Sequence, residues 1–270
     1  MTAIRPKFER PPLIEQAITV VFDEMAGFSI GDFGLFWNLV RSEFPACDQA
    51  PPLAAQIEQL GELPVLPELR LVVGETLPRC LYRNPDNGEV VQVQNDRFTF
   101  NWAKLGDTPY PHSEGTIGRF TEMFNRFEAY VKGRGLGVPN LRQCEITNVN
   151  IVPVSDFGAG FEDAPRAFNL PNLKPEGEIL VNETYTQITQ HLIVQNGNNK
   201  GRLHVSQQPV ISAADQSKAI KLELTARSGR GNGDLAEALA FFDIARSAIN
   251  AAFLAYTTRD MWAHWGLKNG

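Results

Sequence analysis

The sequence predicts an α+β protein made of two similar halves, each with a strand, a helix, an antiparallel meander and a long closing helix. Three observations support this prediction. Segments with a two-residue apolar period are bounded by turn signals, two long segments have the helical period, and the order of these segments recurs along the chain. We place the halves at residues 1–138 and 139–270, packed as one compact unit, because 270 residues is close to the size at which a single core stops growing.

The first strand covers residues 13–22, where apolar and polar residues alternate. Glu15 lies on the face opposite the apolar set. If nothing covers that face, the carboxylate is solvated. If a helix or partner covers it, Glu15 needs an arginine or a backbone donor and becomes a candidate ligand-binding residue. The predicted core face consists of Ile14, Ile18, Val20 and Phe22.

A capping box at Ser29 and Asp32 predicts a helix that ends at Pro45. Residues 45–67 lack a period and are predicted to be a loop with a helical turn at 53–60. Strands are expected at residues 69–73, 79–83, 89–94 and 98–102, with Asn87-Gly88 as a hairpin turn. The last of these strands has an aromatic face, Phe98, Phe100 and Trp102.

The clearest helix is predicted to begin at Ser113, whose hydroxyl can cap it, and to end at the glycines of residues 133–137. Its apolar stripe favours packing over the aromatic face just described. The alternative, a stacking platform for single-stranded nucleic acid, has few basic neighbours to support it. The stripe consists of Ile117, Phe120, Phe124, Phe127 and Val131.

The second half repeats this order loosely, with strands at residues 141–152, 179–195, 202–211 and 218–227. Residues 153–177 are an irregular insertion, and residues 196–201 form a hairpin. A second capping box at Asp234 and Glu237 begins the last long helix. The repetition suggests an internal duplication in which a curved sheet grips the long helices. The TATA-box-binding topology is an analogy for this arrangement, and a shared fold does not fix function.

Composition narrows the environment and the partners. The formal net charge of −6 disfavours nucleic acid and anionic lipid as partners. Three widely spaced cysteines, Cys47, Cys80 and Cys144, are typical of a reducing cytoplasm. No apolar run reaches the length of a membrane span or of a signal peptide core. We therefore expect a soluble, cytoplasmic protein that does not bind membranes.

Several short stretches carry a family resemblance: PPLIEQAITVVF, DRFTFNWAK, the 114–132 helix, ITNVNI, AIKLELTAR and the helix that closes at Trp262. The chain resembles a sporadically distributed, functionally uncharacterised prokaryotic family whose members open with a PP-x-x-E-A strand. It departs from that pattern because Gln16 separates Glu15 from Ala17, and because Glu145 to Asn148 lacks the arginine and aromatic residue that the family favours. The resemblance implies a fold and a patchy distribution typical of mobile or defence-linked genes, and it implies no reaction.

Two clusters are candidate ligand-binding sites. A register that sets Gln195 opposite Arg202 would place His191 and His204 diagonally on one sheet face, where they could bind a metal or move protons, with Glu223 or Lys221 nearby. Solvated histidines are the alternative. The segment RSGRGNGD precedes a helix, so Arg227 and Arg230 could hold a phosphate or carboxylate. A flexible turn is the alternative, since neither a P-loop nor a dinucleotide fingerprint is present.

Trp262 and Trp265 follow the last helical stripe, and they either fold back on the body or form an exposed patch for a partner. No catalytic motif, metal site or cofactor motif is found in the sequence. We therefore expect a protein that acts by binding, as a homo-oligomer or with a protein partner in a small operon-encoded system. The alternative is a small-ligand-binding protein or an enzyme, with a pocket between the sheet and a long helix lined by Glu15, His191, His204 or Arg227.

Overall fold

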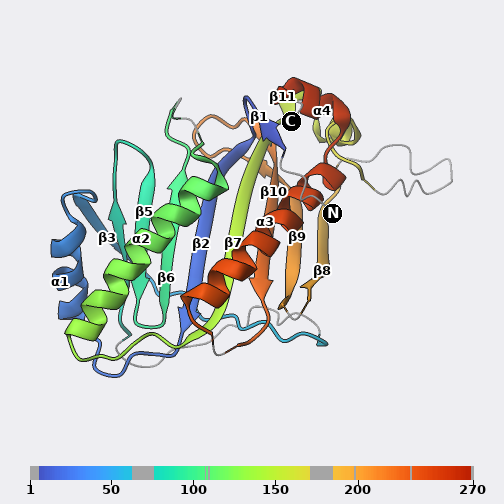
Figure 1. Cartoon of the computed structure of the whole chain (residues 1–270). Helices are drawn as coiled ribbons and strands as arrows, with labels where there is room; N and C mark the ends of the chain where they lie inside the picture. The colour runs from blue at the N-terminus through green and yellow to red at the C-terminus, as the bar shows by residue number, and fades with distance from the viewer. Residues whose placement is uncertain are drawn as a thin grey trace.

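The computed structural model of the chain has helices and antiparallel strands interspersed along the sequence, which confirms the α+β class (Figure 1). The structure describes residues 6–62, 76–106, 108, 110–170, 185–197, 199–231 and 233–268. Within these ranges, nine strands form one large sheet, while β1 (Lys7–Phe8) and β11 (Leu267–Lys268) form a small sheet of their own.

The large sheet has the order β3-β4-β5-β6-β2-β7-β10-β9-β8, and neighbouring strands are antiparallel. The first strands of the two halves, β2 and β7, are paired at its centre, and each half adds its remaining strands outward. One continuous sheet therefore spans both halves. A common origin of the halves by duplication stays a prediction. The bounds are β2 Leu13–Phe22, β3 Ala46–Ala50, β4 Arg79–Arg83, β5 Glu89–Gln94, β6 Arg97–Ala103, β7 Leu141–Pro153, β8 Ile188–Asn196, β9 Asn199–Ile211 and β10 Lys218–Ser228.

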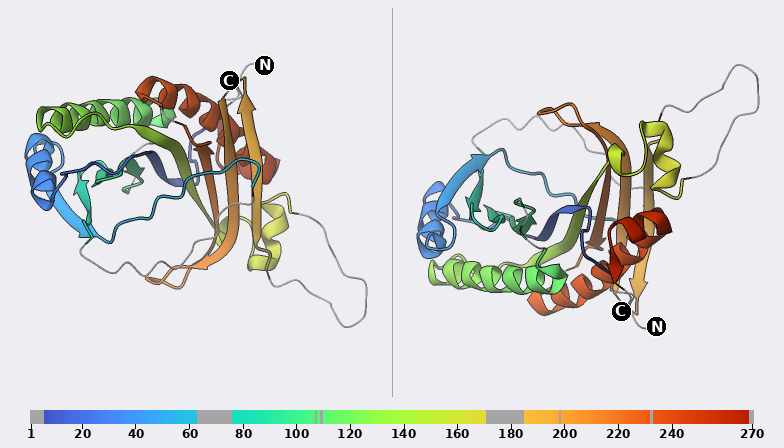
Figure 2. Two further views of the ribbon diagram at one scale, coloured as in Figure 1. Left: turned by 90° about the horizontal axis from the view of Figure 1, so that it is seen from below. Right: turned by 90° about the horizontal axis from the view of Figure 1, so that it is seen from above.

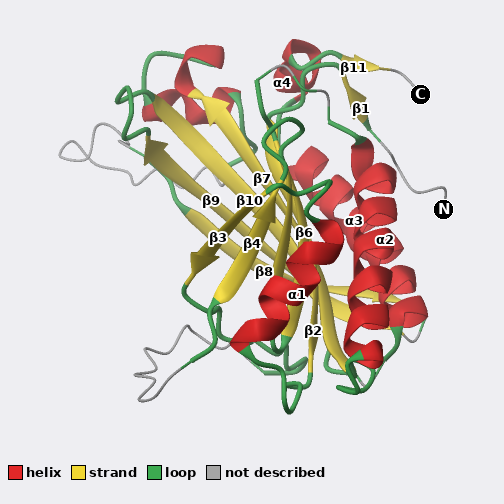
Figure 3. Cartoon of the chain, turned by 90° about the vertical axis from the view of Figure 1, so that its left-hand side faces the viewer, coloured by secondary structure: helices red, strands yellow, loops and turns green. Residues whose placement is uncertain are grey.

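The three longer helices, α1 (Ile30–Val40), α2 (His112–Gly133) and α3 (Leu235–Tyr256), lie on one face of this sheet (Figure 3). Helix α2 contacts β6 and β2, and α3 contacts β7 and β10. The ring of Phe98 on β6 lies 5.3–6.0 Å from three phenylalanine rings of α2, so the predicted packing of the aromatic face under this helix is confirmed.

Helix α1 is tied to α2 through the buried carboxylate of Asp32. It accepts hydrogen bonds from the Ser29 backbone and hydroxyl, which is the predicted capping box, and also from Tyr130 and Arg134. Burial opposes ionisation of Asp32, but these donors outweigh it and hold the pKa of the carboxyl well below its usual range.

Strand β2 departs from the predicted alternation at its beginning. Its register shifts between Leu13 and Glu15, which leaves Ile14 36% exposed. Gln16 takes the place predicted for Ile14, and it is buried on the helix-covered face together with Ile18, Val20 and Phe22. The prediction that Ile14 belongs to the core is therefore wrong, because one irregular residue reverses the faces of the residues before it.

Residues 45–62 also differ from the predicted loop, and residues 63–67 of that loop lie outside the described residues. Ala46–Ala50 form the edge strand β3, and residues 53–60 contain no helix, so the predicted helical turn is wrong. Residues 51–62, which we call the strap, instead run from the β3 side of the sheet to the β8 side (Figure 2, light blue to cyan). The strap contacts Gln94, Arg97, Gln143, Arg202 and His204, which project from the face opposite α2 and α3.

Other boundaries differ in smaller ways. Helix α2 begins at His112 with Pro111 at the N-cap, so Ser113 lies in its first turn and is not the cap. The irregular segment after β7 contains two short helices, η1 (Val154–Asp156) and η2 (Phe161–Arg166). A short helix, α4 (Arg259–His264), follows α3. The strand predicted at 69–73 and the first part of the one predicted at 179–195 lie outside the described residues.

Among the described helices, α3 alone is long and apolar enough to cross a membrane by length and composition. In this structure its apolar stripe packs on the sheet, as a core helix does. The buried residues of α3 are Ala238, Phe241, Phe242, Ala245, Arg246, Ile249, Ala252 and Phe253.

Candidate functional site

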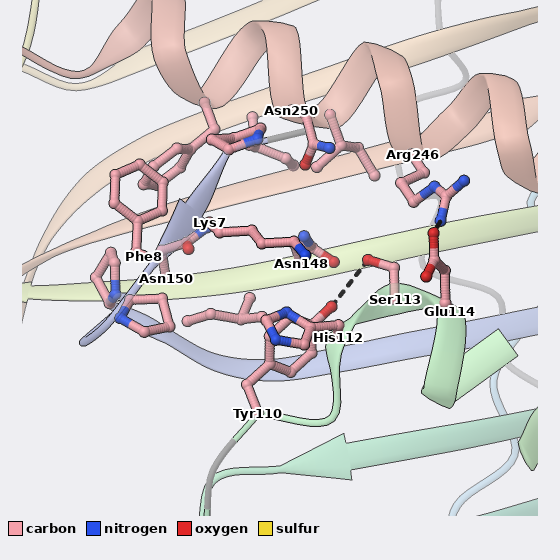
Figure 4. A pocket seen from close by; sticks show the side chains of 17 residues that line it. Lys7, Phe8, Tyr110, His112, Ser113, Glu114, Asn148, Asn150, Arg246 and Asn250 are labelled. Carbon is pink, nitrogen blue, oxygen red and sulfur yellow. Dashed lines mark hydrogen bonds and ion pairs between the residues drawn. The ribbon is translucent and has the colours of Figure 1, made fainter. Parts of the chain in front are cut away.

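A cavity of about 170 Å³ opens where the two halves meet on the helix-covered face (Figure 4). The first turn of α2 and the middle of α3 form two of its sides, and β1, the start of β2 and the centre of β7 complete it. The cavity therefore needs elements from both ends of the chain. It is smaller than the ~300–1,000 Å³ pockets that hold drug-sized ligands, so it suits a compact molecule.

A hydrogen-bonded network of uncharged side chains underlies this cavity. Gln16 is its centre, since its Nε2 donates to Asn148 Oδ1 at 2.8 Å and to Ser113 Oγ at 3.2 Å. Its Oε1 accepts from the Thr116 hydroxyl. Ser113 Oγ is also 2.9 Å from the Tyr110 hydroxyl. Two strands and one helix are thus joined through a single buried amide, which fixes the positions of the side chains that line the cavity.

This network sets the hydrogen-bonding character of the cavity wall. Because Asn148 Oδ1 accepts from Gln16, its Nδ2 amino group is left to donate toward the cavity. Asn150 is oriented the opposite way, since its Nδ2 donates to the Leu222 carbonyl at 3.1 Å and its Oδ1 remains an acceptor. Both asparagines lie on the helix-covered face of β7. The cavity thus offers a donor and an acceptor on the same strand.

The remaining polar groups come from β1, α2 and α3. Lys7 extends along the cavity toward Asn148 (Figure 4) and makes no ion pair with any residue in the described part of the chain. Arg246, in contrast, is buried and held by Glu114 at 3.2 Å and Asp243 at 2.8 Å. Lys7 is therefore the cation at the cavity without an ion pair to a described residue, while the Arg246 guanidinium is held by two carboxylates.

Tyr110 and His112 form the wall on the side of α2. Burial raises the pKa of Tyr110 to about 12, so its hydroxyl stays protonated near neutral pH and can only donate or accept hydrogen bonds. His112 has a φ of 62°, in the left-handed region that a residue with a Cβ adopts at a cost. Its ring lies 5.5 Å from that of Tyr110. Backbone strain of this kind is concentrated at ligand-binding sites.

The opposite end of the cavity is apolar. It is formed by the ring of Phe8 on β1, the ring of Phe253 on α3, and Ile249 one turn earlier. The two rings meet edge to face with their centroids 5.6 Å apart. A bound molecule would thus meet hydrogen-bonding groups at one end and hydrocarbon at the other. The arrangement can hold and orient such a molecule. The Ser113 hydroxyl is bonded to the amide of Gln16 and the phenol of Tyr110, and neither group is a general base that could activate it as a nucleophile.

The predicted site residues lie elsewhere. Glu15 is half-buried on the face opposite the helices, where Asn101 Nδ2 donates to it at 2.5 Å. Gln92 in turn donates to Asn101 at 2.6 Å, and Arg79 donates to Gln92 at 2.9 Å. The carboxylate therefore has an amide as its direct partner, and two amides connect it to a guanidinium. It does not line the cavity.

The two histidines come together, but in a different register from the predicted one. Gln195 pairs with Lys200, which places His191 directly opposite His204 with their Nδ1 atoms 2.9 Å apart. The predicted register is therefore wrong by two residues, which keeps both histidines on one face but makes them direct and not diagonal neighbours. His204 Nε2 lies 2.7 Å from Glu58 Oε2 on the strap.

Lys221 and Glu223 do not join the histidines. They pair with each other, with the Lys221 Nζ atom 3.0 Å from Glu223 Oε2. Among the described residues, no group of three or more His, Cys, Asp or Glu side chains is placed where it could hold a metal ion.

The two arginines of the glycine-rich segment have separate surroundings. Arg227 donates to Glu145 Oε2 at 2.7 Å on the strap-covered face. Arg230 lines a second cavity of about 370 Å³ at the start of α3, together with Gly229, Gly231 and Asp234. The two side chains thus do not form one anion site.

Of the two alternatives for the tryptophans, the structure has the one in which they fold back. Trp265 is 3% exposed and packs against Phe253 and Phe8 at centroid distances of 5.4 and 6.0 Å. Trp262 is half-buried, and its Nε1 donates to Thr257 Oγ1 at 2.8 Å. Trp265 is therefore part of the core and is not an exposed contact for a partner.

The residues that line the cavity were missed because the sequence interpretation looked for ionisable side chains on the solvent face of strands. The available signal was a polar residue at a core position. Asn148 and Asn150 share a strand face with Ile146, and Arg246 lies in the apolar stripe of α3. Polar groups in such positions require partners, so they mark a network or a site.

No protein-family model, curated protein or solved structure matches this chain, so the site is interpreted from its own residues. The resemblance to the sporadically distributed prokaryotic family stays a prediction.

Proposed function

We propose that the protein binds a compact, partly apolar molecule that carries a carboxylate, in the cavity between α2, α3 and the centre of the sheet. The observation that supports this proposal most directly is the polarity of the cavity. Asn148 Nδ2 and Lys7 Nζ supply donors at one end, while Phe8, Ile249 and Phe253 supply hydrocarbon at the other. A carboxylate accepts hydrogen bonds and neutralises Lys7, and an apolar tail gains free energy by leaving water.

The first turn of α2 adds to the preference for an anion. The dipole of the helix favours negative charge at this end, although Glu114 in the same turn reduces this effect. Asn150 Oδ1 supplies an acceptor beside these donors. A carboxylic acid with a hydroxyl or amino group near the carboxylate would therefore use more of the cavity than a simple fatty acid.

Thermal unfolding with a panel of short-chain carboxylic acids and their neutral amides tests the proposal. We expect a rise in Tm with a subset of the acids and none with the matching amides, since a ligand at about 100 times its Kd stabilises the fold by about 2.7 kcal/mol. The variant Asn148→Asp should abolish the shift, because it replaces the donor by a carboxylate of the same shape. Asn125→Asp, on the exposed face of α2, is the charge-matched control and should keep it.

Equal shifts with acids and amides would contradict the carboxylate, and no shift with any acid in the folded protein would count against the proposal as a whole.

A second candidate function is association through a sheet edge, as expected for a homo-oligomer or a protein partner. It is favoured by β8, which is an edge strand with nearly all of its side chains exposed, including Ile193 at 59%. Mass in solution measures this directly. A homo-oligomer that becomes monomeric on Ile193→Lys would support it, and a monomer unchanged by the substitution would contradict it.

A further inference from the structure

The strap is held on the sheet by polar contacts rather than by buried hydrocarbon. Apart from Glu58, its side chains are exposed or half-buried, and Leu53 is 42% exposed. The side chains beneath it are buried and reach its main chain. Gln94 bonds the N–H and carbonyl of Leu53, Arg97 the carbonyl of Ala54, Gln143 the carbonyl of Gln56 and the N–H of Glu58, and Arg202 the carbonyls of Gln59 and Glu62.

These contacts resemble the way in which a receptor holds an extended peptide. Hydrogen bonds to main-chain N–H and carbonyl groups do not depend on the side chains of the segment that is bound. They come from four different strands, β5, β6, β7 and β9, so they follow the strap across the sheet. We call the side chains that contact the strap the track: Gln94, Arg97, Gln143, Arg202 and His204.

The strap side chain that the track recognises by charge is Glu58. It is 5% exposed, its Oε1 lies 2.6 Å from Arg202 Nη1, and its Oε2 lies 2.7 Å from His204 Nε2. Burial opposes ionisation, but His204, Arg202 and Arg227 outweigh it and lower the pKa of Glu58. The carboxylate is therefore charged at neutral pH, and its position is defined from two sides.

Without Glu58, this end of the face would carry an excess of positive charge. Arg97, Arg202 and Arg227 are all largely buried here, and among the described residues the carboxylate that forms ion pairs with them besides Glu58 is Glu145, which lies 2.7 Å from Arg227 and 3.8 Å from Arg97. Buried guanidinium groups without a counter-charge are costly. A ligand that takes the place of the strap must therefore bring a carboxylate of its own.

We propose that the track is a binding site for an extended acidic peptide of a partner protein, and that the strap occupies it as an internal competitor. Main-chain contacts to Gln143 and Arg202 would hold the peptide, and a glutamate would take the place of Glu58 between Arg202 and His204. Because a tethered segment competes at an effective concentration in the millimolar range, a partner needs several matched contacts to displace it. This site lies on the face opposite the cavity, so it is independent of the function proposed above.

The test uses the full-length protein with Glu58→Lys, which places a positive charge beside Arg202 and should release residues 56–62 of the strap. A fluorescent peptide with the sequence of those residues, QIEQLGE, is added, and its anisotropy is measured. We expect it to bind Glu58→Lys at least tenfold more tightly than wild type. The same peptide with glutamine in place of its first glutamate should lose this preference. Glu62→Lys, an equal charge change at an exposed strap position, is the matched control and should behave as wild type.

Hydrogen exchange of the strap amides separates the possible outcomes. Faster exchange across residues 56–62 in Glu58→Lys, together with peptide binding, supports the proposal. A released strap without peptide binding overturns the proposal. A strap that stays protected in Glu58→Lys also overturns it, because the contacts of Glu58 with Arg202 and His204 would then not be what holds the strap. If Glu58→Lys does not fold, Glu58→Gln is tested in the same way and judged by the same outcomes.

Discussion

The two faces of the central sheet are covered in different ways. On one face, α2 and α3 bury a continuous set of aromatic and aliphatic side chains, with Phe98 of the sheet in contact with three rings of α2. On the other face, a segment without regular structure lies on buried glutamine and arginine side chains and contributes one buried carboxylate, Glu58. The first cover is stabilised by area removed from water, and the second by individual polar pairs.

This difference has consequences for what each face can do. A close-packed apolar interface has no low-energy open state, because separating it exposes the whole area at once. A cover held by separate hydrogen bonds and one ion pair can leave in steps, and each step depends on salt or pH. Substitutions in the apolar packing of the helix-covered face should therefore change global stability without local opening, and those under the strap should also change local opening.

The largest effect is expected from Phe124→Ala on the helix-covered face. Phe124 is 1% exposed and packs on Phe98, so truncation should lower the free energy of unfolding by roughly 3–5 kcal/mol through lost burial and a cavity. Urea-induced unfolding measures the loss, which should not depend on salt. Asn125→Ala, the exposed neighbour on the same helix, is the control and should change stability by less than about 0.5 kcal/mol.

A smaller effect is expected from Glu58→Gln on the strap-covered face. The amide keeps the shape and can still hydrogen-bond, but it leaves Arg202 without its counter-charge, so we expect a loss of roughly 1–3 kcal/mol. Strap amides should exchange faster than in wild type, while amides of α2 should be unchanged. Glu62→Gln is the control. Equal changes in both elements would show that the strap opens only with the whole fold and would remove the contrast between the faces.

The helix-covered face was largely predictable from the sequence. The stripe from Ile117 to Val131 and the alternation of Phe98, Phe100 and Trp102 have the periods of a helix and a strand that pack together, and the Asn87-Gly88 turn fixes their neighbours. Gly88 is required there, since its φ is 74° and a Cβ would lie 2.0 Å from the Ala103 carbonyl oxygen. Local periodicity predicts this face because the positions that face the core must be apolar, and they recur with the period of the helix or strand.

The strap and the cavity could not be predicted in the same way. The strap has no period, and its partners, Gln94, Gln143 and Arg202, are 41 to 143 positions away along the chain. The cavity depends on Gln16, a polar residue on the core face of β2, whose partners Ser113 and Asn148 are 97 and 132 positions away along the chain. Both features arise from contacts between distant segments, and a single sequence does not report these.

The smallest expected effect is a pH dependence of stability that arises from His191. It is also the effect most specific to the strap-covered face. Burial and the neighbouring His204 and Arg202 lower the pKa of His191 below its ordinary value of 6.5, whereas Glu58 on the strap acts in the opposite direction. The folded protein then binds this proton less readily than the unfolded chain, so the stability contributed by the neutral ring is present above pH 6.5 and is lost as the pH falls below it.

The pKa of Glu58 lies below its ordinary value of 4.5, so the stability from its ionised form is lost only at a lower pH, as the pH falls through that lowered value. Two separate declines in Tm are therefore expected on acidification. His191→Gln should remove the decline at the higher pH and keep the one at the lower pH. His264→Gln removes an imidazole that lies beside Asp156, far from the strap, and should keep both declines. If strap exchange rises in the first window in wild type and not in His191→Gln, the histidine pair senses pH for the strap. If the first decline persists in His191→Gln, it has another origin. The two faces of the sheet would then differ in what covers them but not in how their stability depends on pH.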